Sequence, residues 1–159
     1  MNKPCEIPST SPARTREIGE VLGALLQAGD VVVLDGPLGA GKTTFSQGIA
    51  LGLGIDEPVT SPTFVVAREL PPGIRGHRML HVDAYRISSL PEWDDLDLDL
   101  ESSVAVVEWG QRIVDGLPSD RLNVRIEGEG DLRTLCVTAS GSRSDRLMAD
   151  FRANLDSRQ

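Results

Sequence analysis

The stretch Gly36-Pro37-Leu38-Gly39-Ala40-Gly41-Lys42-Thr43 decides the fold of this chain, because it has the G-x-x-x-x-G-K-[ST] pattern of a phosphate-binding loop. The β-branched run 31–34 before it predicts a buried strand, and residues 44–53 after it have apolar side chains at helical spacing. Backbone N–H groups of such a loop, with a helix N-terminus, bind phosphate oxygens. Lys42 is predicted to reach the terminal phosphates, and the Thr43 hydroxyl to hold Mg²⁺. The alternative is a glycine-rich turn followed by an accidental Lys-Thr, and the flanking strand and helix argue against it.

The composition indicates one cytoplasmic domain of 159 residues that does not bind nucleic acid on its own. The formal net charge of −8 opposes independent binding to a phosphate backbone. Lysine occurs only at Lys3 and Lys42, so the N-K-x-D motif of familiar GTPases, which needs another lysine, cannot be present. Residues 1–17 are broken by prolines and charges and do not resemble a signal peptide, and no apolar run approaches membrane-spanning length.

Apolar periodicity and turn residues predict the other elements. Ser11-Pro12 is typical of a helix N-cap and first turn, and the apolar stripe that follows predicts a helix that ends at Gly29. Beyond Gly141, apolar residues recur every four positions, which predicts a short amphipathic helix or a frayed end. The remaining predictions are strands around 65–67, 79–82 and 104–107, a short helix within the acidic stretch 88–101, and a hairpin formed by 122–127 and 132–139.

A nucleotide-hydrolysing phosphate loop needs a carboxylate opposite Thr43, usually at the carboxyl end of a neighbouring strand. Two positions qualify. Glu108 directly follows the apolar run 104–107, and Asp83 directly follows His81-Val82. A strand-ending acid can also face solvent or cap a helix, so both residues remain candidates.

Three other patterns predict no site. The acidic run 94–101 lacks the glycine and glutamate that a calcium loop needs at its sixth and twelfth positions, and it is typical of a solvated face. His77 and His81 have i, i+4 spacing, but they lie in a predicted strand rather than a helix. Cys5 and Cys136 belong to no Cys/His cluster and indicate neither a disulfide framework nor a metal site.

Four motifs in this order resemble the bacterial TsaE (YjeE) family of tRNA threonylcarbamoyladenosine biosynthesis ATPases. They are Leu38-Gly39-Ala40-Gly41-Lys42-Thr43-Thr44-Phe45, Ser61-Pro62-Thr63-Phe64, His81-Val82-Asp83-Ala84-Tyr85-Arg86 and Val107-Glu108-Trp109. The first motif is shared with many ATPases, whereas the other three, in this order and spacing, are specific to the family. The likeness covers about residues 11–141, and 142–159 resembles a C-terminal extension of a single ATPase domain over 1–159.

The resemblance implies an α/β, P-loop NTPase-like fold with a mainly parallel central sheet flanked by helices and a C-terminal β-hairpin. It also implies a slow ATPase that uses ATP and Mg²⁺ and works with TsaD-like and TsaB-like partner proteins. Together these proteins place a threonylcarbamoyl group on the adenosine just 3′ of the anticodon in ANN-decoding tRNAs. ATP hydrolysis is implied to reset the complex between turnovers, and tRNA is contacted only indirectly.

By position, the resemblance also implies roles for individual residues. Gly39, Ala40, Gly41, Lys42, Thr43 and Thr44 would bind the phosphates; Thr43 and Glu108 would bind Mg²⁺; Asp83 would orient the attacking water or the metal's water shell; Thr63, within Ser61-Pro62-Thr63, would sense the γ-phosphate; Trp109 would lie beside the nucleotide, Arg133 would approach it, and Pro12 would lie near the base.

The chain departs from the family pattern at Pro37, where an acidic residue is usual, and within residues 92–101. A second function on the same fold stays open, a small-molecule phosphotransferase. Arginine suits phosphate, and for that function an anion-binding lid would be formed by Arg68, Arg75, Arg78 and Arg86.

Overall fold

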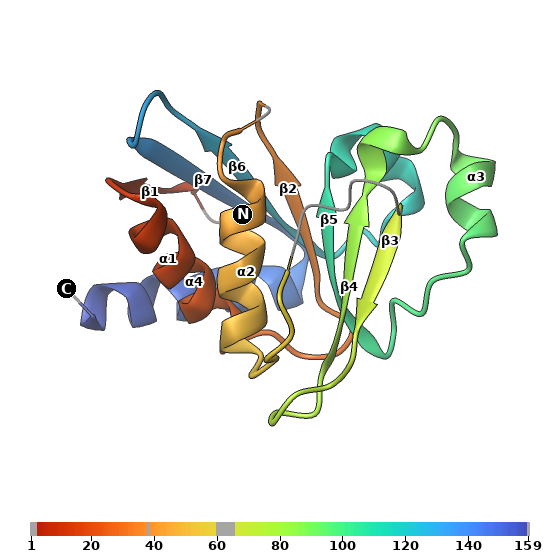
Figure 1. Ribbon diagram of the computed structural model, residues 1–159, viewed down its shortest axis with the longest axis horizontal. Helices are drawn as coiled ribbons and strands as arrows, with labels where there is room; N and C mark the ends of the chain where they lie inside the picture. The colour runs from red at the N-terminus through yellow and green to blue at the C-terminus, as the bar shows by residue number, and fades with distance from the viewer. Residues whose placement is uncertain (1–2, 38, 60–65, 159) are drawn as a thin grey trace.

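The computed structural model describes residues 3–37, 39–59 and 66–158, which form one mixed sheet with helices on both faces (Figure 1). The strand order is β1-β7-β6-β2-β5-β4-β3. The central strands β6, β2, β5 and β4 run parallel, and antiparallel strands extend the sheet at both edges. This is the predicted α/β architecture, and β6 with β7 is the predicted hairpin. The elements are β1 (Cys5–Ser9), α1 (Pro12–Gly23), β2 (Val31–Asp35), α2 (Lys42–Gly52), β3 (Ala67–Leu70), β4 (Arg78–Asp83), the 3-10 segment η1 (Ala84–Arg86), α3 (Leu90–Asp95), β5 (Ser103–Glu108), the 3-10 segment η2 (Gly110–Gly116), β6 (Arg121–Glu127), β7 (Arg133–Ser140) and α4 (Ser142–Ser157).

Alternate side chains of the central strands enter two separate cores. Val32 and Leu34 of β2 pack with α1, α2 and α4 on one face of the sheet. Val31 and Val33 pack on the other face, in a core that includes residues of α3 and η2. Strands β2 and β5 are therefore buried on both faces, which explains why their sequences are continuous apolar runs rather than alternating ones.

Helices α1 and α2 touch backbone to backbone through glycines. A Cβ atom at Gly19 would lie 2.4 Å from the carbonyl oxygen of Phe45, and one at Gly48 would lie 2.0 Å from that of Arg16. These distances are far below van der Waals contact, so larger residues would push the helices apart. The start of α1 lies beside the phosphate loop, since a Cβ atom at Gly41 would lie 3.9 Å from Cγ2 of Thr15.

Several sequence-based boundaries are wrong. The strand expected around 65–67 corresponds to β3, which spans Ala67–Leu70. Helix α1 ends at Gly23 rather than Gly29, because the chain turns there while Leu26 remains fully buried and continues the apolar pattern. Strand β1 was not predicted, since Pro8 masks its alternation; at the edge of a sheet a proline is tolerated. The tail beyond Gly141 forms the 16-residue helix α4, an amphipathic helix rather than a frayed end.

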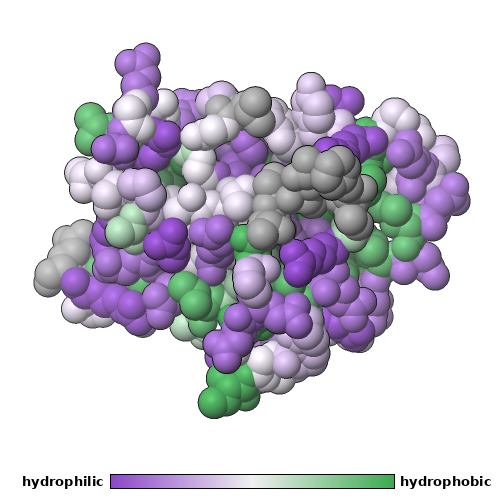
Figure 2. All heavy atoms as spheres, in the orientation of Figure 1, coloured by the Kyte–Doolittle hydropathy of each residue, from purple (hydrophilic) through white to green (hydrophobic). Residues whose placement is uncertain are grey.

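The surface on the side of α1 and α2 is mostly polar, with apolar side chains in small separate groups (Figure 2). Among the described residues, the large apolar side chains that are exposed are Leu51, Ile74, Tyr85, Leu90 and Leu132. Within the same residues, no helix is long and apolar enough to cross a membrane.

Candidate functional site

The phosphate loop connects the end of β2 to the start of α2. A Cβ atom at Gly36, whose φ is +144°, would lie 2.2 Å from the carbonyl oxygen of Ile126 in β6, so the sheet leaves room there only for glycine. Gly41, with φ +109°, stands before Lys42 at the N-terminus of α2, and no side chain of the described residues caps this helix. The first N–H groups of a helix have no intrahelical partner, so this end of α2 can bind an anion.

Lys42 lies inside the site rather than in solvent, with 5% of its surface exposed. Its Nζ donates hydrogen bonds to the carbonyl oxygens of Gly36 (2.7 Å) and Pro37 (3.0 Å), and it lies 4.2 Å from the centre of the Trp109 ring. Burial lowers the pKa of Lys42, and the nearby carboxylates, of which Glu108 has the largest effect, oppose that decrease without cancelling it. The ammonium group is thus oriented by its own loop and by one aromatic face.

The two candidate metal acids end neighbouring parallel strands at the same level, because Asp83 of β4 is the register partner of Glu108 of β5. Val106 packs in the core beneath α1 and α2, and alternation therefore directs Glu108 to the same face as α2. Glu108 is 6% exposed, and Lys42 is close enough for the two charges to interact. The carboxylate is therefore on the phosphate-loop side of the sheet, as predicted.

Glu108 has a hydrogen-bond partner that the sequence did not reveal. Nε2 of His81 lies 2.5 Å from Oε2 of Glu108, and only 1% of His81 is exposed. Asp83, in contrast, caps η1: its carboxylate accepts a hydrogen bond from the Tyr85 N–H at 3.1 Å and lies 3.5 Å from Nε of Arg86. Asp83 therefore caps a helical segment, which was one of the alternatives for an acidic residue at the end of a strand.

Trp109 adopts a left-handed backbone conformation, with φ 60° and ψ 31°, which is uncommon for a bulky residue. The backbone N–H of Trp109 donates a hydrogen bond to the carbonyl oxygen of Leu34 at 2.8 Å, which connects this residue to the end of β2. Its ring centre lies 5.2 Å from that of Tyr85, and Lys42 lies over the ring as described above. Strained residues of this kind cluster at functional sites.

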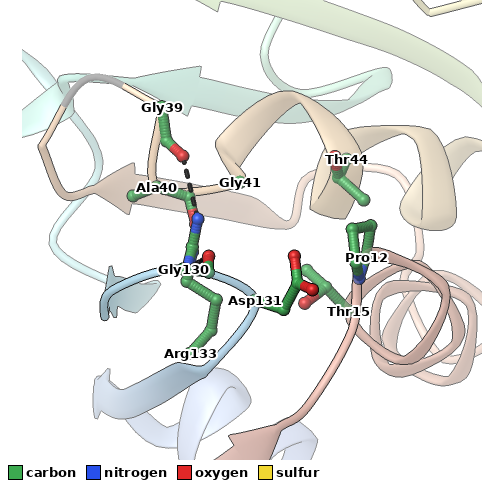
Figure 3. A pocket seen from close by; sticks show the side chains of 9 residues that line it. All are labelled: Pro12, Thr15, Gly39, Ala40, Gly41, Thr44, Gly130, Asp131 and Arg133. Carbon is green, nitrogen blue, oxygen red and sulfur yellow. Dashed lines mark hydrogen bonds between the residues drawn. The ribbon is translucent and has the colours of Figure 1, made fainter.

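A pocket of about 150 Å³ opens beside the phosphate loop (Figure 3). Arg133 reaches it from β7 and ties the hairpin to the loop, since its Nε donates to the carbonyl oxygen of Ala40 at 2.7 Å and its Nη2 to that of Gly39 at 3.2 Å. The walls come from the loop, the start of α1 and the turn between β6 and β7: Pro12, Thr15, Gly39, Ala40, Gly41, Thr44, Gly130, Asp131 and Arg133.

The structure brings most of the predicted site residues into two adjoining groups. Pro12, Thr44 and Arg133 share the pocket with Gly39–Gly41, although they come from three distant parts of the sequence. Lys42, Trp109 and Glu108 form the second group, which includes the first residue of α2. Thr63 and the rest of the Ser61-Pro62-Thr63 segment lie outside the described residues.

Sequence reasoning missed His81, Thr15 and Asp131. His81 carried a usable signal, since it stands two residues before Asp83 in a strand and must share its face. Thr15 is a buried residue whose hydroxyl lies 2.8 Å from that of Ser9, and nothing in its local sequence separates it from a core residue. Asp131 enters the pocket from a polar turn, which alone is typical of any hairpin.

A lid formed by all four arginines Arg68, Arg75, Arg78 and Arg86 is not present, because Arg75 and Arg78 lie away from the phosphate loop. Arg75 donates to the carbonyl oxygens of Gly23, Leu26 and Gly52, at the C-terminal ends of α1 and α2, whereas the phosphate loop is at the opposite end of α2. Arg78 is paired with Glu69 at the far edge of the sheet. These two guanidinium groups stabilise the fold and do not gather over the loop.

The cysteines and the possible metal ligands can be located in the described part of the chain. Cys5 and Cys136 are free thiols. Over the same residues, no group of three or more His, Cys, Asp or Glu side chains could hold a metal ion by itself. Mg²⁺ commonly takes one or two protein carboxylates together with phosphate oxygens and water, so this finding does not exclude a nucleotide-dependent metal.

Comparison with known proteins gives a consistent result over most of the chain. The family described as threonylcarbamoyl adenosine biosynthesis protein TsaE matches residues 9–135. A tRNA threonylcarbamoyladenosine biosynthesis protein TsaE of Streptomyces coelicolor is 52% identical over 136 residues, which cover 80% of this chain and 92% of the relative. The Bacillus subtilis protein of the same description is 40% identical over 147 residues, 90% of each chain. The crystal structure of Bacillus subtilis YdiB superposes with a TM-score of 0.78 at 33% identity, covering 96% of this chain and 97% of the other.

Proposed function

The chain belongs to the TsaE family of tRNA threonylcarbamoyladenosine biosynthesis proteins, and from that membership we propose that it is the Mg·ATP-binding ATPase subunit of this modification. In this role it acts with TsaD-like and TsaB-like proteins on the adenosine 3′ of the anticodon in ANN-decoding tRNAs. One observation carries the proposal: a pocket bounded by the phosphate loop, the start of α1 and Arg133 adjoins a second group that contains Lys42 and Glu108.

The loop supports binding of the ATP phosphates through backbone and side chain together. The uncapped start of α2 supplies N–H donors and partial positive charge. The Lys42 ammonium has three donors, and it can exchange the carbonyls of Gly36 and Pro37 for phosphate oxygens without leaving the site. Arg133 fixes the loop backbone by its bonds to Gly39 and Ala40, so the hairpin keeps the loop in its binding conformation.

The donor chemistry also fits Mg²⁺. Thr43 supplies a hydroxyl, and Glu108 and Asp83 supply carboxylates, the hard oxygen ligands that this ion prefers. When bound, Mg²⁺ would neutralise charge on the β- and γ-phosphates. In this proposal Thr43 and Glu108 hold the ion, and Asp83, already fixed at the start of η1, orients water.

Calorimetric titration with Mg·ATP tests the nucleotide assignment. Lys42→Ala removes a charge-assisted contact worth about 1.5–3 kcal/mol, so the dissociation constant should rise about 10- to 150-fold. Lys3→Ala is the matched control, because Lys3 is the other lysine of the chain and lies before β1. An unchanged affinity for Lys42→Ala would refute the assignment.

A magnesium titration of nucleotide binding tests the metal acid. Glu108→Gln removes the charge but keeps the shape, and it should weaken the dependence of ATP binding on Mg²⁺. Asp97→Asn, in the exposed acidic stretch, should leave that dependence unchanged. The reverse pattern would assign the metal to the acidic stretch instead.

Co-purification tests the partner proteins. The chain should be retained by TsaD-like and TsaB-like proteins in a manner that depends on ATP, and phosphate release should require them or be accelerated by them. Retention by neither protein, with and without ATP, would contradict the proposed division of labour.

A further inference from the structure

A buried imidazole lies beside the proposed metal acid Glu108, and it has no role in the proposed binding of the nucleotide. His81 is 1% exposed, and its neighbours on the same face, Met79 and Val106, are apolar core residues. Burying an imidazole among such residues is unfavourable unless its polar atoms are hydrogen bonded. The bond from Nε2 of His81 to Oε2 of Glu108, at 2.5 Å, satisfies this requirement for one of the two ring nitrogens.

The backbone fixes this pair before any ligand enters. Strands β4 and β5 are parallel neighbours, and His81 is the register partner of Val106, two pairs before Asp83 and Glu108 and therefore on the same face of the sheet. The imidazole therefore contacts Glu108 from the neighbouring strand β4, on the buried side of the carboxylate rather than the solvent side. An ionised carboxylate only accepts hydrogen bonds, so Nε2–H is the donor, and the second carboxylate oxygen is left for other partners.

We infer that His81 is a positioning residue that holds the Glu108 carboxylate in its working orientation, an inference that rests on the proposed ATPase function. Glutamate has three rotatable side-chain bonds, and a bond at one oxygen restricts them before ATP binds. Groups that orient a metal-binding carboxylate in this way commonly affect activity about 10- to 100-fold when removed.

The same bond restrains Glu108 next to an opposite charge. Glu108 and the Lys42 ammonium lie in the same part of the site, close enough to interact electrostatically. A Glu108 side chain released from His81 could turn towards Nζ of Lys42 and compete with phosphate for that cation. The imidazole bond opposes this movement, because it anchors Oε2 on the side of β4.

Two substitutions at one position separate orientation from packing. His81→Leu introduces an apolar side chain of similar bulk and removes the Nε2–H donor. His81→Gln retains an amide N–H donor near the position of Nε2. We expect His81→Leu to reduce turnover of Mg·ATP at least tenfold and to raise the Mg²⁺ concentration needed for nucleotide binding, while ATP affinity in saturating Mg²⁺ changes less than threefold. His81→Gln should recover most of both losses. His77→Leu is the control, since the other histidine is only partly buried and precedes β4.

A double-mutant cycle with Glu108→Gln decides the matter, read out both by turnover and by the Mg²⁺ dependence of ATP binding. If His81 acts through Glu108, then His81→Leu adds little in the Glu108→Gln background. Independent, multiplying effects would overturn the inference. The inference would also be overturned if Glu108→Gln reduced turnover while His81→Leu had normal turnover. That result would leave the proposed function intact.

Two further outcomes complete the test. Failure of wild-type protein to bind Mg·ATP would refute the proposed function and the inference with it. If His81→Leu does not fold, nitrogen-detected magnetic resonance of the wild-type imidazole replaces it: a proton on Nε2 protected from solvent exchange supports the inference, and a proton on Nδ1 alone overturns it.

Discussion

Replacing Gly48 by alanine should destabilise the protein by about 2 kcal/mol, because it forces α1 away from α2. The added Cβ would lie 2.0 Å from the carbonyl oxygen of Arg16 and 3.0 Å from the backbone nitrogen of Glu20, against an ordinary contact of about 3.4 Å. Both neighbours are backbone atoms, so no rotamer change relieves the clash. Overpacking costs about 1–3 kcal/mol or more, and a clash above 1 Å belongs at the upper end. Alanine recovers about 1 kcal/mol of helix propensity, which leaves the net loss.

Urea unfolding followed by circular dichroism measures this effect, and thermal unfolding should show a midpoint lower by about 4–8 °C. Leu51→Ala is the control on the same helix, since Leu51 is 50% exposed, and it should cost less than about 0.5 kcal/mol. Pro12 and Thr15 of α1 line the pocket, so Gly48→Ala should also weaken ATP binding severalfold. A variant as stable as the wild type would mean that the two helices are not in backbone contact.

Three further results are expected. Trp109→Phe should abolish the change in tryptophan emission on adding ATP, because the indole lies against Lys42, whereas Trp93→Phe should preserve it; a signal lost only with Trp93 contradicts this. Burial alone would raise the pKa of Asp120, but hydrogen bonds from Ser144 and Arg143 outweigh this effect and hold the pKa below its usual value. Asp120 therefore stabilises the start of α4 above about pH 4, and this contribution is lost as the pH falls through the lowered pKa. Asp120→Asn should therefore cost about 0.5 kcal/mol at pH 7 and nothing near pH 2, and an equal loss at both pH values would contradict the charge argument. Purified protein should not bind tRNA at physiological salt, since its net charge is −8; tight, salt-sensitive binding in a fluorescence titration would refute this.

Local patterns were sufficient for the elements that build the loop. The phosphate-loop motif, the double-sided burial of 104–107 and the Ser11-Pro12 cap are each set by a few neighbouring residues, and the structure has the corresponding elements. The hairpin was also predictable, because its turn and alternation lie within one short segment. The edge strand β1 was not, since its pairing with β7 depends on residues far along the chain.

The parts of the site that depend on contacts between strands were harder to predict. Nothing in the sequence specifies that Arg133 donates to the carbonyls of Gly39 and Ala40, because that contact depends on how the hairpin folds back beside the loop. The His81–Glu108 bond requires the parallel register of β4 and β5, which a single sequence does not give. The predicted positions of Arg75 and Arg78 in an arginine lid were wrong for the same reason, because spacing along the chain does not determine where a guanidinium group lies in the fold.

The sheet order has a consequence for synthesis on the ribosome. Strand β2, which leads into the phosphate loop, lies between β5 and β6, so both of its neighbours come from residues 103–127. Since the chain emerges N-terminus first, the apolar strand must wait unpaired until most of the protein has been made. Nascent or prematurely terminated chains that end before β5 should therefore lack a nucleotide site and expose an aggregation-prone strand edge.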